Sequence, residues 1–232
     1  MMEEEVREIA LPGEIIAKGS EWKAGIGVYK EGEDIFSMYL GVKKVKGNYV
    51  NVIPLSGRYI PKRDDIIVGK VVDIGPSNWI LDINSPYQAF LYVSEVPWKI
   101  EFGETAKYID IGDCLIVKVS GIDETMRVQV SMSEPPLKKI TSGIIIEIAQ
   151  TKVPRIIGRG GSMISILKKE TNCRIFVGQN GRIWLEGKPE DISIATIAIK
   201  KIEKEAHQLG LTDTITKFFE QVRMDKHDKT IG

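Results

Sequence analysis

The pattern of apolar and polar positions predicts a chain that is mostly β at first and mixes strands with helices later. Between residues 63 and 134, short stretches of alternating apolar and polar residues are separated by Gly, Pro, Asn and Asp. That alternation is typical of half-buried β-strands joined by turns. After residue 141, apolar residues also recur every three or four positions, which is typical of amphipathic helices. We therefore expect a multidomain chain, mostly β and then α+β.

The β-rich part after residue 62 has the strand count of a small barrel. Five short strands with one longer connection, residues 94–110, fit an OB-type barrel over residues 63–138. Trp79 has the parity of Leu81 and Ile83, so we expect its ring in the barrel core rather than on the surface. We place the strands at residues 66–74, 79–83, 89–93, 113–119 and 127–132.

Residues 141–210 predict the element order β-α-α-β-β-α. A short helical turn is expected at residues 153–157, a second helix after residue 161, and a long helix from residue 187. Residues 178–181 read as a hairpin turn. Strands are expected at residues 143–148, 173–177 and 183–185. Residues 211–232 are expected to form a carboxy-terminal helix or tail.

A two-glycine loop lies between the first two predicted helices, in the sequence Ile-Gly-Arg-Gly-Gly-Ser-Met-Ile from residue 157 to residue 164. Gly158 and Gly161 have no Cβ, so the backbone of a ligand can come very close. The amides at the start of the next helix carry partial positive charge, and Arg159 adds a full charge. By itself such a loop is more often a plain helix–helix turn. In this element order it is the GxxG loop of a KH domain, which clamps about four nucleotides of a single strand.

The whole span from residue 141 to residue 210 matches the order of a type I KH domain. We expect this domain to bind single-stranded RNA through the loop and the basic side chains around it. The expected contacts are Gly158, Arg159, Gly160, Gly161, Arg155, Lys168, Lys169 and Arg174.

The charge distribution supports this placement, although the net charge of the 232-residue chain is zero. Residues 1–62 are balanced, with 9 basic and 9 acidic residues. Residues 63–140 carry 8 basic and 12 acidic residues, a net charge of −4, whereas residues 141–232 carry 15 and 11, a net charge of +4. The positive excess therefore accompanies the GxxG loop, as phosphate binding requires. It is modest, so we do not expect tight binding by this chain alone.

Residues 69–132 resemble the repeated RNA-binding OB domain of the large ribosomal small-subunit protein. The resemblance rests on Gly69-Lys70-Val71-Val72, Leu91-Tyr92-Val93-Ser94-Glu95 and Arg127-Val128-Gln129-Val130-Ser131-Met132. It implies RNA contacts by Tyr92, Asp123 and Arg127. Two surface aromatics usual in that family are missing, because their positions hold Ser77 and Ile80. The alternative to RNA contact by Tyr92 and Arg127 is that both side chains lie on a solvated barrel rim. The barrel is expected to bind RNA weakly or mostly to guide it.

The first 62 residues predict a small β domain with strands near residues 25–29, 36–42 and 49–55. So short a β domain buries little surface alone and is often docked on a larger partner. Its apolar residues exceed what a small core needs, so we expect some of them to meet that partner. The apolar residues considered are Ile9, Leu11, Ile15, Ile26, Phe36 and Tyr39.

The domain order as a whole resembles the KH-bearing RNA-binding cap subunit of the archaeal-type RNA exosome. The resemblance also rests on Leu11-Pro12-Gly13-Glu14, the stretch from Pro61 to Gly69, and the motif Trp79-x-x-Asp82-Ile83-Asn84-Ser85-Pro86-Tyr87-x-Ala89. It implies that three copies sit on a hexameric ring of phosphorolytic 3′–5′ ribonuclease subunits. The amino-terminal domain would contact the ring, the barrels would surround the pore, and the catalytic residues would belong to the ring.

The sequence offers no catalytic or metal-binding constellation, so we expect neither an enzyme nor a cofactor. Asp64-Asp65 and Asp110-x-x-Asp113 are carboxylate pairs beside strand starts, where turn capping is the usual role. Cys114 and Cys173 have no CxxC spacing and are expected to be buried thiols. No apolar run is long enough to span a membrane and no signal peptide is recognisable, so we expect a soluble, cytoplasmic protein. The alternative function is a free-standing OB–KH protein of transcription or translation.

Overall fold

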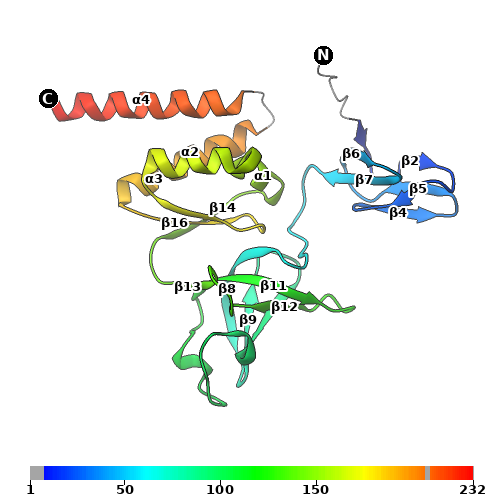
Figure 1. Ribbon diagram of the computed structural model, residues 1–232, viewed down its shortest axis with the longest axis horizontal. Helices are drawn as coiled ribbons and strands as arrows, with labels where there is room; N and C mark the ends of the chain where they lie inside the picture. The colour runs from blue at the N-terminus through cyan, green and yellow to red at the C-terminus, as the bar shows by residue number, and fades with distance from the viewer. Residues whose placement is uncertain (1–7, 207–209, 232) are drawn as a thin grey trace. The chain divides into compact units, whose positions relative to one another are not determined.

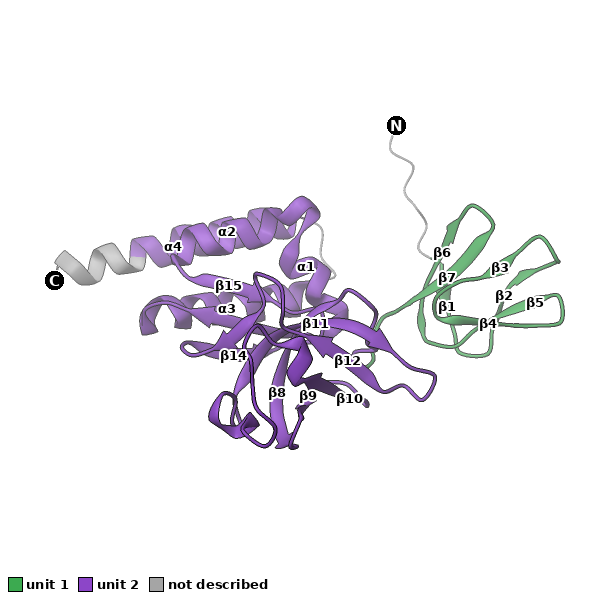
Figure 2. Cartoon of the chain, turned by 60° about the horizontal axis from the view of Figure 1, so that its bottom comes forward, with its two compact units in different colours: residues 1–57 green, residues 58–232 purple. Residues whose placement is uncertain are grey.

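The computed structural model describes residues 8–206 and 210–231, with side chains up to residue 224. Residues 1–7, 207–209 and 232, which the predicted domains include, lie outside the described residues. The chain forms two compact units, Met1–Gly57 and Arg58–Gly232, which Figure 2 colours separately. The first unit thus ends at Gly57 rather than at residue 62. Tyr59 already belongs to the barrel core, where its hydroxyl donates a hydrogen bond to Asp65 at 2.6 Å.

The first unit is built from two small sheets around a core of six buried residues. One sheet has the order β1-β6-β7-β3 and the other the order β2-β5-β4. The core residues are Ala10, Ile16, Val28, Ile35, Val50 and Val52. The strands are β1 (Ile9–Ala10), β2 (Ile15–Lys18), β3 (Lys23–Ala24), β4 (Val28–Glu31), β5 (Asp34–Ser37), β6 (Gly41–Lys46) and β7 (Tyr49–Pro54).

The single strand predicted at residues 36–42 is wrong, because the structure divides it between the two sheets. Strand β5 ends at Ser37 and β6 begins at Gly41. The buried Ser37 hydroxyl donates a hydrogen bond to the carbonyl of Tyr39 at 2.7 Å, which bends the chain between the strands. Hydroxyl groups that bond the backbone two residues on favour turns over strands.

The second unit begins with a closed five-stranded barrel, which confirms the predicted OB-type fold. The strands follow the order β12-β10-β9-β8-β11, and pairing between β11 and β12 closes the ring. They are β8 (Ile66–Ile74), β9 (Asn78–Asp82), β10 (Gln88–Tyr92), β11 (Cys114–Ile122) and β12 (Val128–Ser131). Trp79 is fully buried and its Nε1 donates to the Ile109 carbonyl at 3.0 Å, which confirms its predicted core position.

Three short elements of the barrel were not predicted. Strand β13 (Lys138–Ile140) pairs with β11 and leads out of the barrel. Two 3₁₀ turns, η1 (Val93–Glu95) and η2 (Thr105–Lys107), lie in the long connection between β10 and β11. Pieces this short carry too few residues for a periodic pattern to show.

The remainder of the second unit is the predicted KH domain. Its sheet has the order β14-β16-β15, all antiparallel, and its helices cover one face of that sheet (Figure 1). The elements are β14 (Ile144–Glu147), η3 (Gln150–Lys152), α1 (Val153–Ile157), η4 (Arg159–Gly161), α2 (Ser162–Thr171), β15 (Arg174–Val177), β16 (Arg182–Glu186) and α3 (Pro189–Glu205). The α+β part of the fold prediction is therefore confirmed.

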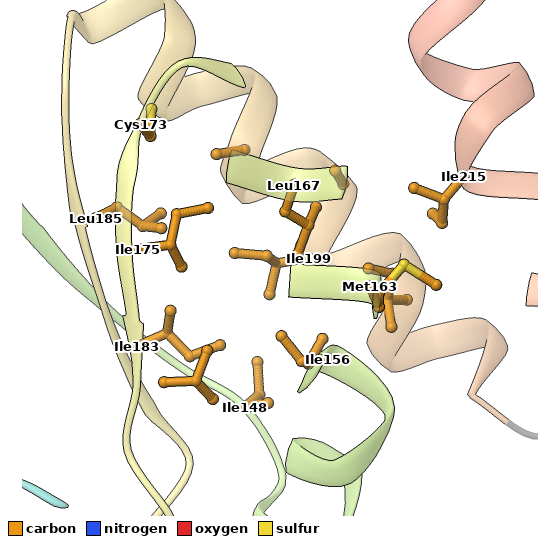
Figure 3. Close-up of a cluster of buried hydrophobic side chains, with 14 of the residues drawn as sticks. Ile148, Ile156, Met163, Leu167, Cys173, Ile175, Ile183, Leu185, Ile199 and Ile215 are labelled. Carbon is orange, nitrogen blue, oxygen red and sulfur yellow. The ribbon is translucent and has the colours of Figure 1, made fainter. Parts of the chain in front are cut away.

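The carboxy-terminal helix α4 (Leu211–Ile231) shares the hydrophobic core of the KH domain. Leu211, Ile215 and Phe219 are buried in that core, and Figure 3 shows Ile215 facing Met163. These three residues recur every four positions, so they lie on one face of the helix. The sequence placed residues 211–232 beyond the KH domain, whereas the segment of this helix from Leu211 to Phe219 packs as part of it.

The other face of the KH sheet packs against the barrel. Trp184 of β16 forms a buried cluster with Val68 of β8 and Ile116 of β11. Both faces of β16 are therefore covered, which explains why its four residues from Arg182 to Leu185 are all buried. The barrel and the KH domain consequently form one packed body within the second unit.

Candidate nucleic-acid interface

The GxxG loop is held on helix α2 by a close backbone contact at Gly158. The chain leaves α1 at this residue with φ +75°, and its amide donates a hydrogen bond to the Pro154 carbonyl at 2.9 Å. A Cβ at this position would lie 2.6 Å from the amide nitrogen of Met163, well inside van der Waals contact. Gly158 is therefore required for the turn itself, whether or not RNA is bound.

The rest of the loop leaves its backbone open to the outside. Gly160 and Gly161 both have positive φ, at +59° and +80°, and a Cβ on Gly160 would meet nothing within 4 Å. Arg159 is exposed beside them, and the ten-residue helix α2 begins directly afterwards at Ser162. An anion at this loop would face exposed backbone, the positive end of a helix and one guanidinium. The geometry suits a phosphodiester.

The four other basic residues predicted around the loop are not gathered at one point. Arg155 is partly buried on α1, one helical turn before Arg159. Lys168 and Lys169 are exposed in the last turn of α2, about 9 Å along the helix axis from its first residue. Arg174 begins β15 and pairs with Glu186 at 3.2 Å, so part of its charge is already compensated. The structure thus places Arg159 at the loop and distributes the other charges along the domain.

The barrel brings two of its three predicted residues to one face. Tyr92 points outward from β10 and is partly exposed, because its neighbour Leu91 fills the barrel core. Arg127 is exposed just before β12, the parallel neighbour of β10. Its guanidinium carbon lies 5.3 Å from the ring centroid of Phe90, the other outward aromatic of β10. Sequence reasoning missed Phe90, although the buried Ala89 and Leu91 beside it give it the outward parity.

Asp123, the third predicted residue, lies in the turn before Arg127 and is exposed. Its Oδ1 accepts hydrogen bonds from the amide and hydroxyl of Thr125, at 2.9 and 2.7 Å, and from the amide of Arg127 at 2.8 Å. The Thr125 hydroxyl first, and then the Arg127 amide, hold the pKa of this carboxyl below its usual range. The carboxylate closes the turn between β11 and β12. Its hydrogen bond to the Arg127 amide helps to position Arg127, and its role in RNA binding stays a prediction.

Ser77 and Ile80 occupy the two positions at which the family that the barrel resembles usually has surface aromatics. Ser77 is partly buried, and its carbonyl accepts the amide of Val93 at 3.1 Å. Ile80 is partly exposed and lies directly opposite Phe90 in the β9–β10 register. The outer face of β9 thus offers one aliphatic side chain and no ring at these two positions.

A second Gly-x-x-Gly sequence, from Gly178 to Gly181, is buried against the barrel. The Asn180 amide nitrogen donates to the carbonyls of Val68 and Ile83, at 2.8 and 2.9 Å, and its Oδ1 accepts the Val68 amide at 3.3 Å. The amide of Gln179 donates to the carbonyl of Ile66 at 3.0 Å. This hairpin therefore binds the barrel backbone through the Gln179 amide and the buried Asn180 side chain, so these groups are not available to a ligand.

An ion-pair network closes the same junction. Arg182 of β16 donates to the Asp82 carbonyl at 2.7 Å, to the Asp82 carboxylate, and to Glu147 at 2.8 Å. Burial opposes ionisation of Asp82 most strongly, but the hydrogen bonds from Arg182 and the Asn84 amide, together with the charges of Arg182 and Lys70, hold the pKa of that carboxyl below its usual range. Burial likewise opposes the charge on Arg182, yet its two carboxylate partners raise its pKa.

The described part of the chain contains no group of three metal-ligating side chains of the His, Cys, Asp or Glu type. Within the same residues, no helix is long and apolar enough to cross a membrane.

Three family models match separate stretches of the chain. The model described as the exosome RNA-binding protein RRP4 N-terminal domain matches residues 7–56. The RRP4 S1 domain model matches residues 58–102, which begin the barrel. A KH domain model matches residues 143–191, which include the GxxG loop.

Curated relatives match nearly the whole chain. The exosome complex component Rrp4 of Methanosarcina acetivorans is 45% identical over 227 residues, covering 97% of this chain and 87% of the relative. The Rrp4 of Methanothermus fervidus is 44% identical over 214 residues, covering 91% of this chain and 95% of the relative. A crystal structure described as an exosome complex RNA-binding protein is 39% identical and has a TM-score of 0.67, covering 73% of this chain and 99% of that one.

Proposed function

The chain belongs to the Rrp4 family of exosome complex components, and from that premise we propose that it captures single-stranded RNA and delivers it to a ring of 3′–5′ exoribonuclease subunits. In this proposal the chain is a cap subunit on a hexameric ring, present in three copies. In it the chain carries no catalytic residues of its own, and the three matching domain models are the Rrp4 amino-terminal, S1 and KH domains.

The observation that carries the proposal is the open GxxG loop. Gly160 exposes its backbone just before α2, and Arg159 adds positive charge at the same place. Such a loop grips the phosphates of a single strand while leaving the bases to the rest of the domain. Arg155, Lys168, Lys169 and Arg174 would then attract the strand along the KH domain.

The barrel supplies a second, weaker contact in this proposal. Tyr92 and Arg127 lie on neighbouring strands with their side chains outward. Asp123 contributes by fixing the turn that carries Arg127. Because the net charge of residues 63–140 is −4, the barrel would guide the strand more than hold it.

Residues 1–57 are the proposed docking domain. This unit leaves many large apolar side chains exposed around a core of only six buried residues. An exposed apolar surface of this kind marks a protein–protein contact, and a stable interface needs roughly 800 Å² from each partner. The side chains that are more than half exposed are Ile9, Leu11, Ile26, Tyr49 and Ile53.

The test is reconstitution with the purified ring subunits and an end-labelled single-stranded RNA. We expect the chain alone to leave the RNA intact with and without phosphate, and to raise degradation of long RNA when the ring is present. Removing residues 1–57 should abolish co-elution with the ring in gel filtration while the remaining fragment still binds RNA weakly. Equal degradation rates with and without the chain would contradict the cap role and favour a free-standing OB–KH protein. The expected cytoplasmic location stays a prediction that cell fractionation checks.

A further inference from the structure

Helix α4 runs beside α2, the helix that begins at the GxxG loop. Ile215 of α4 is fully buried and faces Met163, the second residue of α2 (Figure 3). Further along, Arg223 of α4 forms an ion pair with Glu170, near the end of α2. The two anchor points are eight residues apart on α4 and seven residues apart on α2. The helices therefore run in the same direction, and α4 accompanies α2 over nearly its whole length (Figure 1).

The first of these anchor points lies directly behind the loop. A Cβ on Gly158 would lie 2.6 Å from the amide nitrogen of Met163 and 2.8 Å from its Cβ, so Gly158 rests against the backbone of that residue. The Met163 side chain is buried in the KH core, where it faces Ile215. A line of contacts thus leads from α4 through Met163 to the first glycine of the loop.

Helix α2 depends on such support because it is short. It has ten residues, whereas helices shorter than about 12–15 residues are marginal in water without packing. Leu167 is fully buried in the KH core in the middle of α2, and α4 supports its start at Met163. Because protein interiors are closely packed, a smaller side chain at Ile215 would let the first turn of α2 shift. That shift would displace the exposed backbone of Gly160 and the positive end of α2.

We propose that α4 is part of the RNA-binding apparatus, because it holds the start of α2, and with it the GxxG loop, in the geometry that accepts a phosphodiester. Ile215 is a positioning residue in this arrangement, and it acts through Met163. This inference rests on the proposed RNA-binding function and deepens it.

The experiment compares two alanine variants of the full-length chain in a fluorescence anisotropy titration with a labelled oligouridine, well below both unfolding midpoints. Ile215→Ala opens a cavity beside Met163. Leu185→Ala removes the same number of carbon atoms from a fully buried position that Figure 3 shows on the opposite side of the core. Both variants should lower the midpoint of thermal unfolding by similar amounts. The RNA affinity should fall about tenfold in Ile215→Ala alone, because a binding group displaced by a fraction of an ångström loses its geometry.

A second measurement follows the loop without RNA. Amide hydrogen exchange of residues 158–165, measured by mass spectrometry, should be faster in Ile215→Ala than in the wild-type chain. It should stay at the wild-type rate in Leu185→Ala. Ile215→Leu keeps the side-chain volume, so it should restore most of the slow exchange and of the RNA affinity.

Three results would overturn the role of α4. They are wild-type hydrogen exchange of residues 158–165 in Ile215→Ala, full RNA affinity in that variant, and an equal loss of affinity in Leu185→Ala. If any of these occurs while Arg159→Glu still weakens binding, the GxxG loop and the proposed function stand and only the role of α4 falls. If the wild-type chain does not bind the oligouridine at all, the proposed function fails and this inference fails with it.

Discussion

The KH domain contains two loops of the form Gly-x-x-Gly that the structure uses in opposite ways. The loop from Gly158 to Gly161 joins two helices and turns Gly160 outward, where an added Cβ would meet nothing within 4 Å. The loop from Gly178 to Gly181 joins two strands and is tied to the barrel, with Asn180 fully buried. The first loop exposes Arg159 and Gly160, whereas the buried Asn180 side chain of the second loop is bonded to the barrel.

The difference comes from the residues between and around the glycines. Arg159 offers an exposed charge, and Gly160 offers exposed backbone with no side chain. Asn180 has both a donor and an acceptor on a short side chain, so it can pair with the carbonyl and the amide of the same strand residue, Val68. The same glycine spacing thus predicts a tight turn in both cases but not what the turn contacts.

The largest effect should come from removing the Asn180 side chain. Asn180→Ala leaves the buried carbonyls of Val68 and Ile83 and the Val68 amide without their partners. We expect the free energy of unfolding to fall by about 3 kcal/mol or more, because each orphaned buried group costs roughly 1–3 kcal/mol. Urea denaturation measures this change. Gln179→Ala is the matched control, since that side chain is exposed in the same loop, and an equal loss in both variants would contradict the assignment.

The next prediction compares alanine substitutions of two glycines in the loop from Gly158 to Gly161. Gly158→Ala places a Cβ 2.6 Å from the Met163 amide at a positive φ, so we expect a loss of about 3 kcal/mol in the free energy of unfolding. Gly160→Ala meets no atom and should cost only about 1 kcal/mol for its left-handed backbone. Thermal unfolding of the two variants, side by side, measures the difference. If both variants lose the same free energy of unfolding, Gly158 is not the residue that holds the loop against α2.

A smaller effect, and one on binding rather than stability, is expected at Arg159. Arg159→Glu replaces an exposed positive charge with a negative one beside the proposed phosphate position. RNA affinity should fall about tenfold, which is roughly 1.4 kcal/mol, while the unfolding midpoint stays unchanged. A filter-binding titration measures the affinity. Lys188→Glu makes the same charge change at another exposed site of the domain, and an equal loss there would mean that only net charge matters.

The smallest effect is a pH dependence of the buried junction. In the folded chain Arg182 holds the pKa of Asp82 below its ordinary value, so both are charged at neutral pH. A depressed carboxyl pKa stabilises the folded state above the ordinary pKa of about 4, and this contribution is lost as the pH falls below it. Because Asp82 is partly exposed, we expect at most about 1 kcal/mol. The difference in unfolding free energy between wild type and Asp82→Asn should therefore shrink from pH 7 to pH 3, and a constant difference would contradict the ion pair.

The element order of both RNA-binding domains could be read from local patterns. Alternating apolar residues placed β8 at its observed bounds and three other barrel strands within one residue of their observed ends, whereas β11 continues three residues past its predicted end. The apolar stripe of helix α3 and the turn at residues 178–181 were also predicted, because each is recognisable from residues that are close together in the chain. The amino-terminal unit was predicted less well, since strands of two to four residues carry too few positions to show a period.

The residues of the candidate site also differ in how far the sequence alone could identify them. The GxxG loop was found because its glycines, its charge and the following helix are contiguous in the sequence. Phe90 was not singled out, because its contact with Arg127 depends on the parallel pairing of β10 with β12. Asp123 was assigned to RNA by resemblance, whereas its hydrogen bonds to Thr125 and Arg127 appear only once the turn is built.

The sequence by itself determined which elements form and where a backbone can be approached closely, because periodicity and glycine act over a few neighbouring residues. The tertiary structure alone decided which surfaces stay available. It covered the free face of the KH sheet with β8 and β11, buried Asn180 and Arg182, and added α4 to the KH core. Each of these contacts joins segments far apart in the chain, and the desolvation of a polar group or an apolar face depends on the partner that folding brings to it.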